Sequence, residues 1–342
     1  MWESKEMELV VASHPSALLH DTGPGHPERP ERVEAVRRGL GDSGLELREI
    51  TSPRIERSEL ALVHEPAYIE MIERFCLMGG GALDMDTYVT ADSWDAALTA
   101  AGAVRALVEE LGERTDRVGF AISRPPGHHA MPARAMGFCL FNNVAVSAAY
   151  LRARGERVAV IDWDVHHGNG TQAILSRDPG ALYASIHQEH FYPFDGHVDD
   201  IEETEAKGTV VNVPLPAHTG GDVYRQAWME LVLPVVAQFE PDWVLVSAGF
   251  DAHVDDHLAH MRLIADDYGW MASQLAGIHP ASRTVATLEG GYDLAALHDG
   301  ARATVLGLTG RWESASSPLE SPPSSHAALG KAAAAIARHW VL

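Results

Sequence analysis

The sequence predicts an α/β fold in which a central, mostly parallel sheet carries helices on both faces. Short apolar, β-branched runs alternate along the chain with longer stretches of helical spacing. This alternation is typical of parallel sheets, because the chain usually returns through a helix between parallel strands. With 342 residues and 46% apolar composition, the chain can form one large domain or two smaller ones.

Five runs have the length and composition of buried strands, and each ends in polar or turn-forming residues. The predicted strands are 118–122, 158–161, 182–186, 243–247 and 284–288. Helical spacing and composition occur at 92–111, 143–154, 222–238 and 264–276. These segments account for the sheet and for part of its helical cover.

The last part of the chain differs in composition from the rest. Residues 314–324 are rich in Ser and Pro, which favours a loop crossing the surface. An alanine-rich helix is predicted from 326 to about 339. We expect this tail either to pack on the domain or to form a contact between copies of the chain.

Composition restricts the chemistry of any metal site. Cys76 and Cys139 are the two cysteines of the chain, too few for a disulfide framework or a cysteine-based zinc site. A metal would therefore be held by His and carboxylate side chains.

Charge and hydropathy indicate which partners to expect. The formal charge of −22 argues against nucleic-acid binding, which depends on Lys and Arg neutralising phosphates. The charge suits a cationic substrate or partner, or serves solubility alone. Apolar runs fall short of the roughly 20 residues of a membrane span, and the first residues lack the order of a signal peptide. We expect no membrane contact and a cytoplasmic location.

Polar clusters follow four of the five predicted strands. SRPPGHHA follows 118–122, DWDVHHGNG follows 158–161, AGFDAH follows 243–247 and EGGYD follows 284–288. Ligands of open parallel sheets bind at the carboxyl ends of the strands. The sequence therefore predicts that the four clusters converge on one crevice.

Two of these clusters supply candidate metal ligands. Alternation along an extended segment places Asp162, Asp164 and His166 on one side of the chain, and Asp251 arrives from another strand. Three protein ligands leave positions open for water and substrate, as in catalytic zinc sites. The oxygen-rich set also suits Fe²⁺ or Co²⁺. The alternative is that these loop residues only cap the next helix.

A pair of histidines, His128 and His129, follows a Pro-Pro-Gly turn that would hold both rings in one place. Asp162 and Asn169 are the available partners. A carboxylate partner raises the basicity of one imidazole, whereas an amide perturbs the other less. Two roles in proton transfer are expected, unless the pair is merely solvated on its loop.

Aromatic residues complete the predicted crevice. Tyr292 follows two glycines, so its phenol could donate a hydrogen bond to an oxyanion instead of being satisfied in the core. Near Gly137, the rings of Phe138 and Tyr192 could form a slot for a thin apolar chain, although such rings are more often core.

These motifs resemble those of the histone deacetylases. PPGHH, GFCLFNN, DWDVHHGNGTQ, SIH, FYP, VNVPLP, SAGFDAH and LEGGYDL occur in the order and spacing of that family. HDTGPGHPERPERVEAV is similar to the first rim loop of the class II and bacterial members. The resemblance covers about 13–308, and 309–342 form the Ser/Pro-rich loop and helix.

The resemblance implies a single arginase-like domain, 1–342, around an eight-stranded parallel sheet. It also implies zinc-dependent removal of acetyl groups from amines, with acetyl-lysine side chains as substrate and acetylated polyamines as the alternative. HFYPFDGHVDD is similar to acetylpolyamine amidohydrolases. Those enzymes narrow their entrance through dimer contacts, so a homo-oligomer is compatible with the sequence.

The resemblance assigns roles by matching motif. Zinc would be bound by Asp164, His166 and Asp251, and His129 would be the base that activates water. His128, paired with Asp162, would act electrostatically or as a proton shuttle. Asn169 stands where class I enzymes have aspartate, so the chain is similar to class II. The remaining assignments are an oxyanion donor, Tyr292; tunnel and rim residues Gly137, Phe138, Tyr192, Leu258, Gly291 and Asp86; and a structural potassium set, Asp162, Asp164, His166, Ser185 and Ile186.

One position departs from the family pattern. His257 stands where many members have proline in Asp-Pro-Leu, which removes a turn-fixing residue at the tunnel mouth. The shape of the rim, and with it the substrate preference, therefore does not follow from the resemblance. Two other functions remain as alternatives: a non-catalytic acyl-lysine binding protein, which the complete residue set disfavours, and a binuclear manganese ureohydrolase, which needs more bridging carboxylates.

Overall fold

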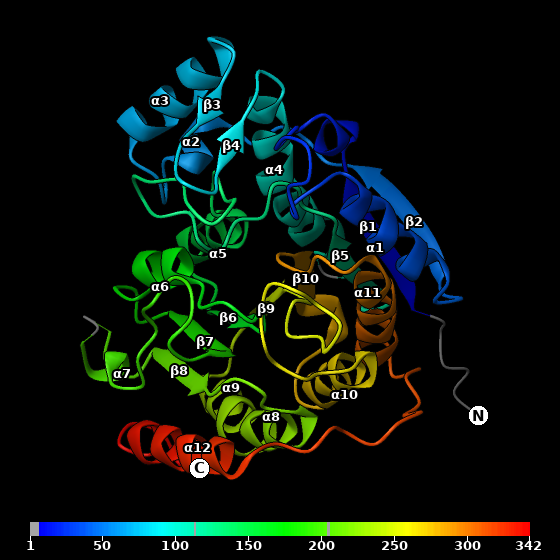
Figure 1. Cartoon of the computed structure of the whole chain (residues 1–342), viewed down its shortest axis with the longest axis vertical. Coiled ribbons are helices and arrows are strands. Elements are labelled where there is room, and N and C mark those ends of the chain that lie inside the picture. The colour runs from blue at the N-terminus through cyan, green and yellow to red at the C-terminus, as the bar shows by residue number, and fades with distance from the viewer. Residues whose placement is uncertain (1–6, 113, 204–205) are drawn as a thin grey trace.

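The computed structural model describes residues 7–112, 114–203 and 206–342 as a single α/β domain (Figure 1). Its centre is an eight-stranded sheet of order β2-β1-β5-β10-β9-β6-β7-β8. Every neighbouring pair in this sheet is parallel. The strands are β1 Glu8–Ser13, β2 Glu46–Thr51, β5 Arg117–Ala121, β6 Val158–Asp162, β7 Ala181–Gln188, β8 Val210–Leu215, β9 Trp243–Ala248 and β10 Thr284–Leu288. The predicted eight-stranded α/β fold is confirmed.

Helices cover both faces of the sheet and bury alternate residues of its strands. In β1, Leu9 and Val11 face a core formed with α1, with α8 to α12 and with the turn between α8 and α9. Val10 and Ala12 point to the opposite face and pack against α4 and α5. The helices are α1 Glu31–Gly41, α2 Arg57–Leu60, α3 Pro66–Leu77, α4 Ser93–Leu111, α5 Asn143–Ala153, α6 Asn169–Leu175, α7 Asp200–Glu203, α8 Gly221–Ala227, α9 Leu233–Phe239, α10 Ala265–Ala276, α11 Leu294–Leu308 and α12 Pro323–Ile336.

The helix predicted over 222–238 is interrupted. Between α8 and α9 lies one π-helical turn, Trp228–Val232. Pro234 stands in the first turn of α9, lacks a backbone N–H and would clash with the carbonyl four residues earlier in a continuous α-helix. The wider turn accommodates the proline without ending the helical segment.

The C-terminal tail packs on the domain. Helix α12 lies against β8 and α8, and its side chains Leu329 and Ile336 are buried in the larger core (Figure 1). Its start at Pro323 falls inside the segment predicted as loop, because proline is well tolerated in the first turn of a helix. The tail therefore extends the cover of the sheet edge.

The strand order brings the four polar clusters together. β5, β10, β9 and β6 are consecutive in the sheet, although they are far apart in the chain. The chain adds β2 beyond β1 on one side of these four strands, and β7 and β8 beyond β6 on the other. The carboxyl ends of the four strands therefore border the crevice where ligands bind in open parallel α/β sheets. Among the described residues, no helix is both long enough and apolar enough to cross a membrane.

Candidate active site

The three predicted metal ligands form one cluster at the carboxyl ends of β6 and β9. One ligand atom from each of Asp164, His166 and Asp251 lies within 4.8 Å of the others, the one such group of three or more among the described residues. Nδ1 of His166 is 3.1 Å from Oδ1 of Asp164 and 3.2 Å from Oδ2 of Asp251. Both carboxylates are fully buried.

The backbone orients these carboxylates and leaves one oxygen without a backbone donor. Oδ2 of Asp164 accepts from the Gly290 amide at 2.7 Å, and Oδ1 of Asp251 accepts from the Val165 amide at 2.9 Å. Oδ2 of Asp251 is buried and makes no well-directed hydrogen bond, and Nδ1 of His166 faces it at 3.2 Å. Burial and the nearby charge of Asp164 raise the pKa of Asp251 to about 6. A divalent cation would satisfy this oxygen and both charges, so the residues fit a metal.

Two glycines give the carboxylates their space. A Cβ at Gly290 would lie 2.0 Å from Oδ2 of Asp251, and one at Gly249 would lie 2.1 Å from Oδ2 of Asp164. Any side chain at either position would displace a candidate ligand. Gly249 and Gly290, which follow β9 and β10, are therefore part of the site.

The two histidines have the partners that the sequence suggested. Nδ1 of His128 is 3.0 Å from Oδ2 of Asp162, and Nδ1 of His129 is 2.9 Å from Oδ1 of Asn169. Asn169 directs its amide nitrogen to two methionine sulfurs, which leaves its oxygen to face His129. Nδ1 of His129 therefore donates, and its Nε2 keeps a lone pair for a proton.

The two imidazoles differ in basicity because their surroundings differ. Burial disfavours charge on His128, but the carboxylates of Asp164 and Asp162 outweigh it and raise the pKa of His128 to about 10. Burial, together with His128 and His166, holds the pKa of His129 well below its ordinary value. The pair thus combines a cationic ring with a neutral one, their centroids 4.0 Å apart.

Glu289 is a site residue that sequence reasoning missed. Its buried Oε2 accepts from the amides of Gly127 and His128 at 2.7 and 3.1 Å, which fixes the turn that carries the histidines. Burial raises the pKa of Glu289 to about 7. The sequence signal that could have identified it is the position of Glu289, a charged residue directly after the apolar strand 284–288.

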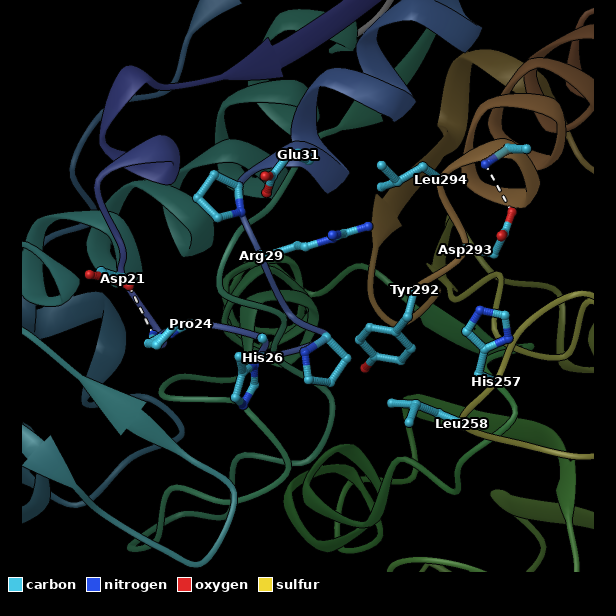
Figure 2. A pocket seen from close by; sticks show the side chains of 15 residues that line it. Asp21, Pro24, His26, Arg29, Glu31, His257, Leu258, Tyr292, Asp293 and Leu294 are labelled. Carbon is cyan, nitrogen blue, oxygen red and sulfur yellow. Dashed lines mark hydrogen bonds between the residues drawn. The ribbon is translucent and has the colours of Figure 1, made fainter.

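Tyr292 lines a cavity of about 850 Å³ at the mouth of the site (Figure 2). The cavity lies between the loop that contains His26, the Leu258 segment and the start of α11. Burial raises the pKa of Tyr292 well above its ordinary value, so the phenol stays protonated. The Arg32 guanidinium lies 5.0 Å from the Tyr292 ring centroid and donates to the Gly291 carbonyl.

Of the predicted slot residues, Tyr192 lies beside the metal cluster and Phe138 beside Tyr292. The Tyr192 ring centroid lies 5.1 Å from that of His129 and 6.2 Å from that of His166, and Phe138 lies 5.9 Å from Tyr292. Gly137 has a φ of 56°, and a Cβ there would lie 2.4 Å from the His129 ring. Close approach of the backbone to the histidine requires glycine here.

The rim residues are held by hydrogen bonds between loops. Oδ1 of Asp86 accepts from the Thr87 hydroxyl at 2.9 Å, and the Asp86 carbonyl lies 3.2 Å from Nε2 of His26. The Thr87 hydroxyl oxygen in turn accepts from the Phe138 amide at 3.1 Å. Asp86 thus belongs to a network that ties the antiparallel hairpin of β3 (Gly81–Ala82) and β4 (Tyr88–Val89) to the slot.

The residues predicted to hold potassium lie on neighbouring elements. Asp162, the last residue of β6, and Ser185, within β7, are register partners, and Ile186 follows in β7. The Ser185 hydroxyl is 2.9 Å from Nδ1 of His187. Potassium itself stays a prediction.

Comparison with known proteins gives the same family as the motifs. Residues 26–308 match the histone deacetylase domain. The chain is 39% identical to a histone deacetylase-like amidohydrolase of Pseudomonas aeruginosa, over 92% of this chain and 87% of that protein. It is 37% identical to a probable deacetylase of Archaeoglobus fulgidus, over 84% and 82%.

A solved structure extends the likeness to the fold. The crystal structure of the HDA15 HD domain superposes with a TM-score of 0.90 at 32% identity, covering 98% of this chain and 96% of that one. The family match covers most of the chain, and the relatives align with it over most of their length. Together they show the family and its general chemistry, hydrolysis of acetylated amines. The chain belongs to the histone deacetylase family.

Proposed function

We propose that the protein is a zinc-dependent deacetylase that hydrolyses the acetyl amide of acetyl-lysine side chains to acetate and a free amine. The observation that carries the proposal is the placement of a neutral His129 beside the cluster of Asp164, His166 and Asp251. Asp164, His166 and Asp251 would hold the zinc ion, which would supply Lewis-acid chemistry at the acetyl carbonyl and at water.

The side chains then divide the proton transfers. Nε2 of His129 accepts the proton of the attacking water, since its Nδ1 already donates to Asn169, and this proton passes to the amine as the C–N bond breaks. His128 stays cationic beside Asp162 and favours the build-up of negative charge nearby. The protonated phenol of Tyr292 donates a hydrogen bond to the oxyanion, and the slot of Phe138 and Tyr192 takes the methylene chain.

Acetylated polyamine is the second candidate substrate, because it presents the same amide on a thin methylene chain. Burial, and after it the negative charge of Asp86 and Asp84, raises the pKa of Tyr192, so carboxylate charge acts on this wall of the slot. This charge favours a cation without selecting a basic peptide or a polyamine. Structural potassium, a cytoplasmic location and a homo-oligomer remain predictions.

A side-by-side assay tests the proposal. Zinc-loaded protein is given an acetyl-lysine peptide, acetylputrescine and acetylspermidine, each with and without a hydroxamate inhibitor. We expect hydroxamate-sensitive turnover that is fastest on the peptide. Faster polyamine turnover would move the substrate to the second candidate, and no turnover of any substrate would favour a non-catalytic binding protein.

A further inference from the structure

Asp256, in the loop between β9 and α10, is a buried carboxylate that accepts three backbone hydrogen bonds. Its Oδ2 accepts from the amides of Tyr292 and Asp293 at 2.6 and 3.1 Å. Its Oδ1 accepts from the Leu258 amide at 3.1 Å. The side chain has little contact with solvent and lies outside the candidate metal cluster.

The three donors belong to residues that line the cavity at the mouth of the site. Leu258 approaches the cavity from one loop, and Tyr292 and Asp293 approach it from another (Figure 2). The Asp256 carboxylate therefore joins two walls of the cavity from behind, without lining it.

These contacts act on the backbone from which the phenol projects. The Tyr292 amide is held by Asp256, while the preceding Gly291 carbonyl accepts from Nε of Arg32 at 2.6 Å. Gly291 has a φ of 111°, a conformation that glycine adopts and other residues rarely do. On the other side, Asp293 caps α11 through the amides of Ala295 and Ala296. The phenol thus projects from a short segment anchored on both sides.

A carboxylate is the side chain that suits three converging N–H groups. Both of its oxygens accept and neither carries a hydrogen. An asparagine in the same place would turn its NH₂ group toward at least one of the three donors, whichever way its amide is oriented. Asp256→Asn thus removes an acceptor and opposes at least one donor with almost no change in volume.

We propose that Asp256 is a positioning residue for the proposed reaction. It sets the position and direction of the Tyr292 phenol and links the Tyr292 segment to the Leu258 wall of the cavity. The proposal rests on the proposed function in one respect, since Tyr292 must act on the substrate for its position to affect the rate. Asp256 acts through Tyr292 and touches no substrate.

The kinetic test is a double-mutant cycle on acetyl-lysine peptide. Tyr292→Phe is expected to lower kcat by about 10² to 10³, as for the loss of an oxyanion donor. Asp256→Asn is expected to lower kcat by about 10-fold or more with KM changed less than about 3-fold. In the Tyr292→Phe background, Asp256→Asn should lower kcat by less than about 3-fold, because the hydroxyl that it positions is already gone. The proposal would be overturned if the kcat loss of the double variant equalled the product of the two single losses. An Asp256→Asn variant with wild-type kcat would overturn it as well.

The matched control is Asp255→Asn, which removes the same charge from the neighbouring side chain. Asp255 is 72% exposed and its carboxylate is 3.7 Å from His253, so wild-type kinetics are expected. An equal loss in this control would attribute the effect to charge at the rim rather than to the contacts of Asp256.

Amide hydrogen exchange tests the positioning without any activity. In the wild-type protein, the Tyr292 and Asp293 amides lie outside helices and strands, yet we expect protection because both donate to Asp256. Asp256→Asn should speed exchange at these two amides and at Leu258, while β10 stays protected. Exchange of the wild-type amides at the rate of unstructured peptide would overturn the proposal even if the variant fails to fold. Protected amides in a protein inactive on every acetylated substrate would instead leave the positioning intact and reject the proposed function.

Discussion

At the residue scale, the two histidines differ in basicity because of their surroundings, and their hydrogen-bond partners contribute to the difference. Asp162 offers His128 a carboxylate oxygen, and Asn169 offers His129 an amide oxygen at nearly the same distance. A carboxylate favours the protonated imidazole, whereas a neutral amide lets burial dominate. The proposed base is neutral because burial, His128 and His166 disfavour its charge and its partner supplies no carboxylate to oppose them.

This difference predicts the pH dependence of the reaction. His129 must be neutral to accept a proton, and its pKa is held below 6.5, so kcat/KM should stay high as pH falls to about 6.5. Asn169→Asp adds a negative charge beside His129 and should raise its pKa, which moves the acid limb of the profile to higher pH. Profiles of kcat/KM from pH 5 to 9 for both proteins check this. An acid limb that moves to lower pH in Asn169→Asp would contradict the assignment of His129.

Gly290→Ala tests the space around the candidate ligands. Its Cβ would lie 2.0 Å from Oδ2 of Asp251, so the carboxylate must move away from Asp164 and His166. We expect at least a 10-fold weaker affinity for Zn²⁺, measured by titration against a competing chelator. Gly23→Ala is the control, because a Cβ there meets nothing within 4 Å and any loss of stability reflects its φ of 94° alone. Wild-type zinc affinity in Gly290→Ala would argue against this ligand set.

At the element scale, periodicity predicted the buried strands better than the edges. The five predicted strands match β5, β6, β7, β9 and β10, the buried strands that precede or border the site. β2, at the sheet edge, is missed because only Leu47 and Ile50 are half-buried and they lie three positions apart, so its apolar residues do not alternate. β8 is missed because Pro214 interrupts it. β1 is buried and apolar, and its omission from the predicted strands has no structural reason.

Site residues whose contacts span the chain could not be predicted in the same way. The Glu289 carboxylate accepts from the amide of a residue 162 positions earlier, and Asp256 accepts from amides 36 and 37 positions later. Backbone N–H groups leave no mark in the sequence, so only the fold reveals these partners. The metal and histidine clusters were predictable because their own residue types carry the chemistry.

Helix α12 offers a prediction at this scale. Gly330 lies in its interior, and a Cβ there meets nothing within 4 Å. Gly330→Ala should stabilise the protein by about 0.5–1 kcal/mol, since alanine loses less backbone entropy than glycine on forming a helix. Thermal unfolding with unchanged zinc content checks this. A lower Tm would indicate that the tail packs on the domain differently from the arrangement in Figure 1.

At the scale of the whole molecule, the strand order assembles the site. β5 delivers the histidine pair, β6 and β9 deliver the candidate metal ligands, and β10 delivers Tyr292 and Glu289. Because these strands are consecutive in the sheet, residues more than 160 positions apart meet at one edge. The same convergence places two buried carboxylates near each other, which costs stability unless a cation lies between them.

The most direct measurement is the titration of chelator-treated protein with Zn²⁺, following acetyl-lysine hydrolysis and Tm in the same samples. We expect no activity and a lowered Tm without metal, with both restored in proportion to zinc until one ion is bound per chain. Full activity in the metal-free protein, or activity that appears only when a second ion is bound, would contradict a single-metal deacetylase built on Asp164, His166 and Asp251.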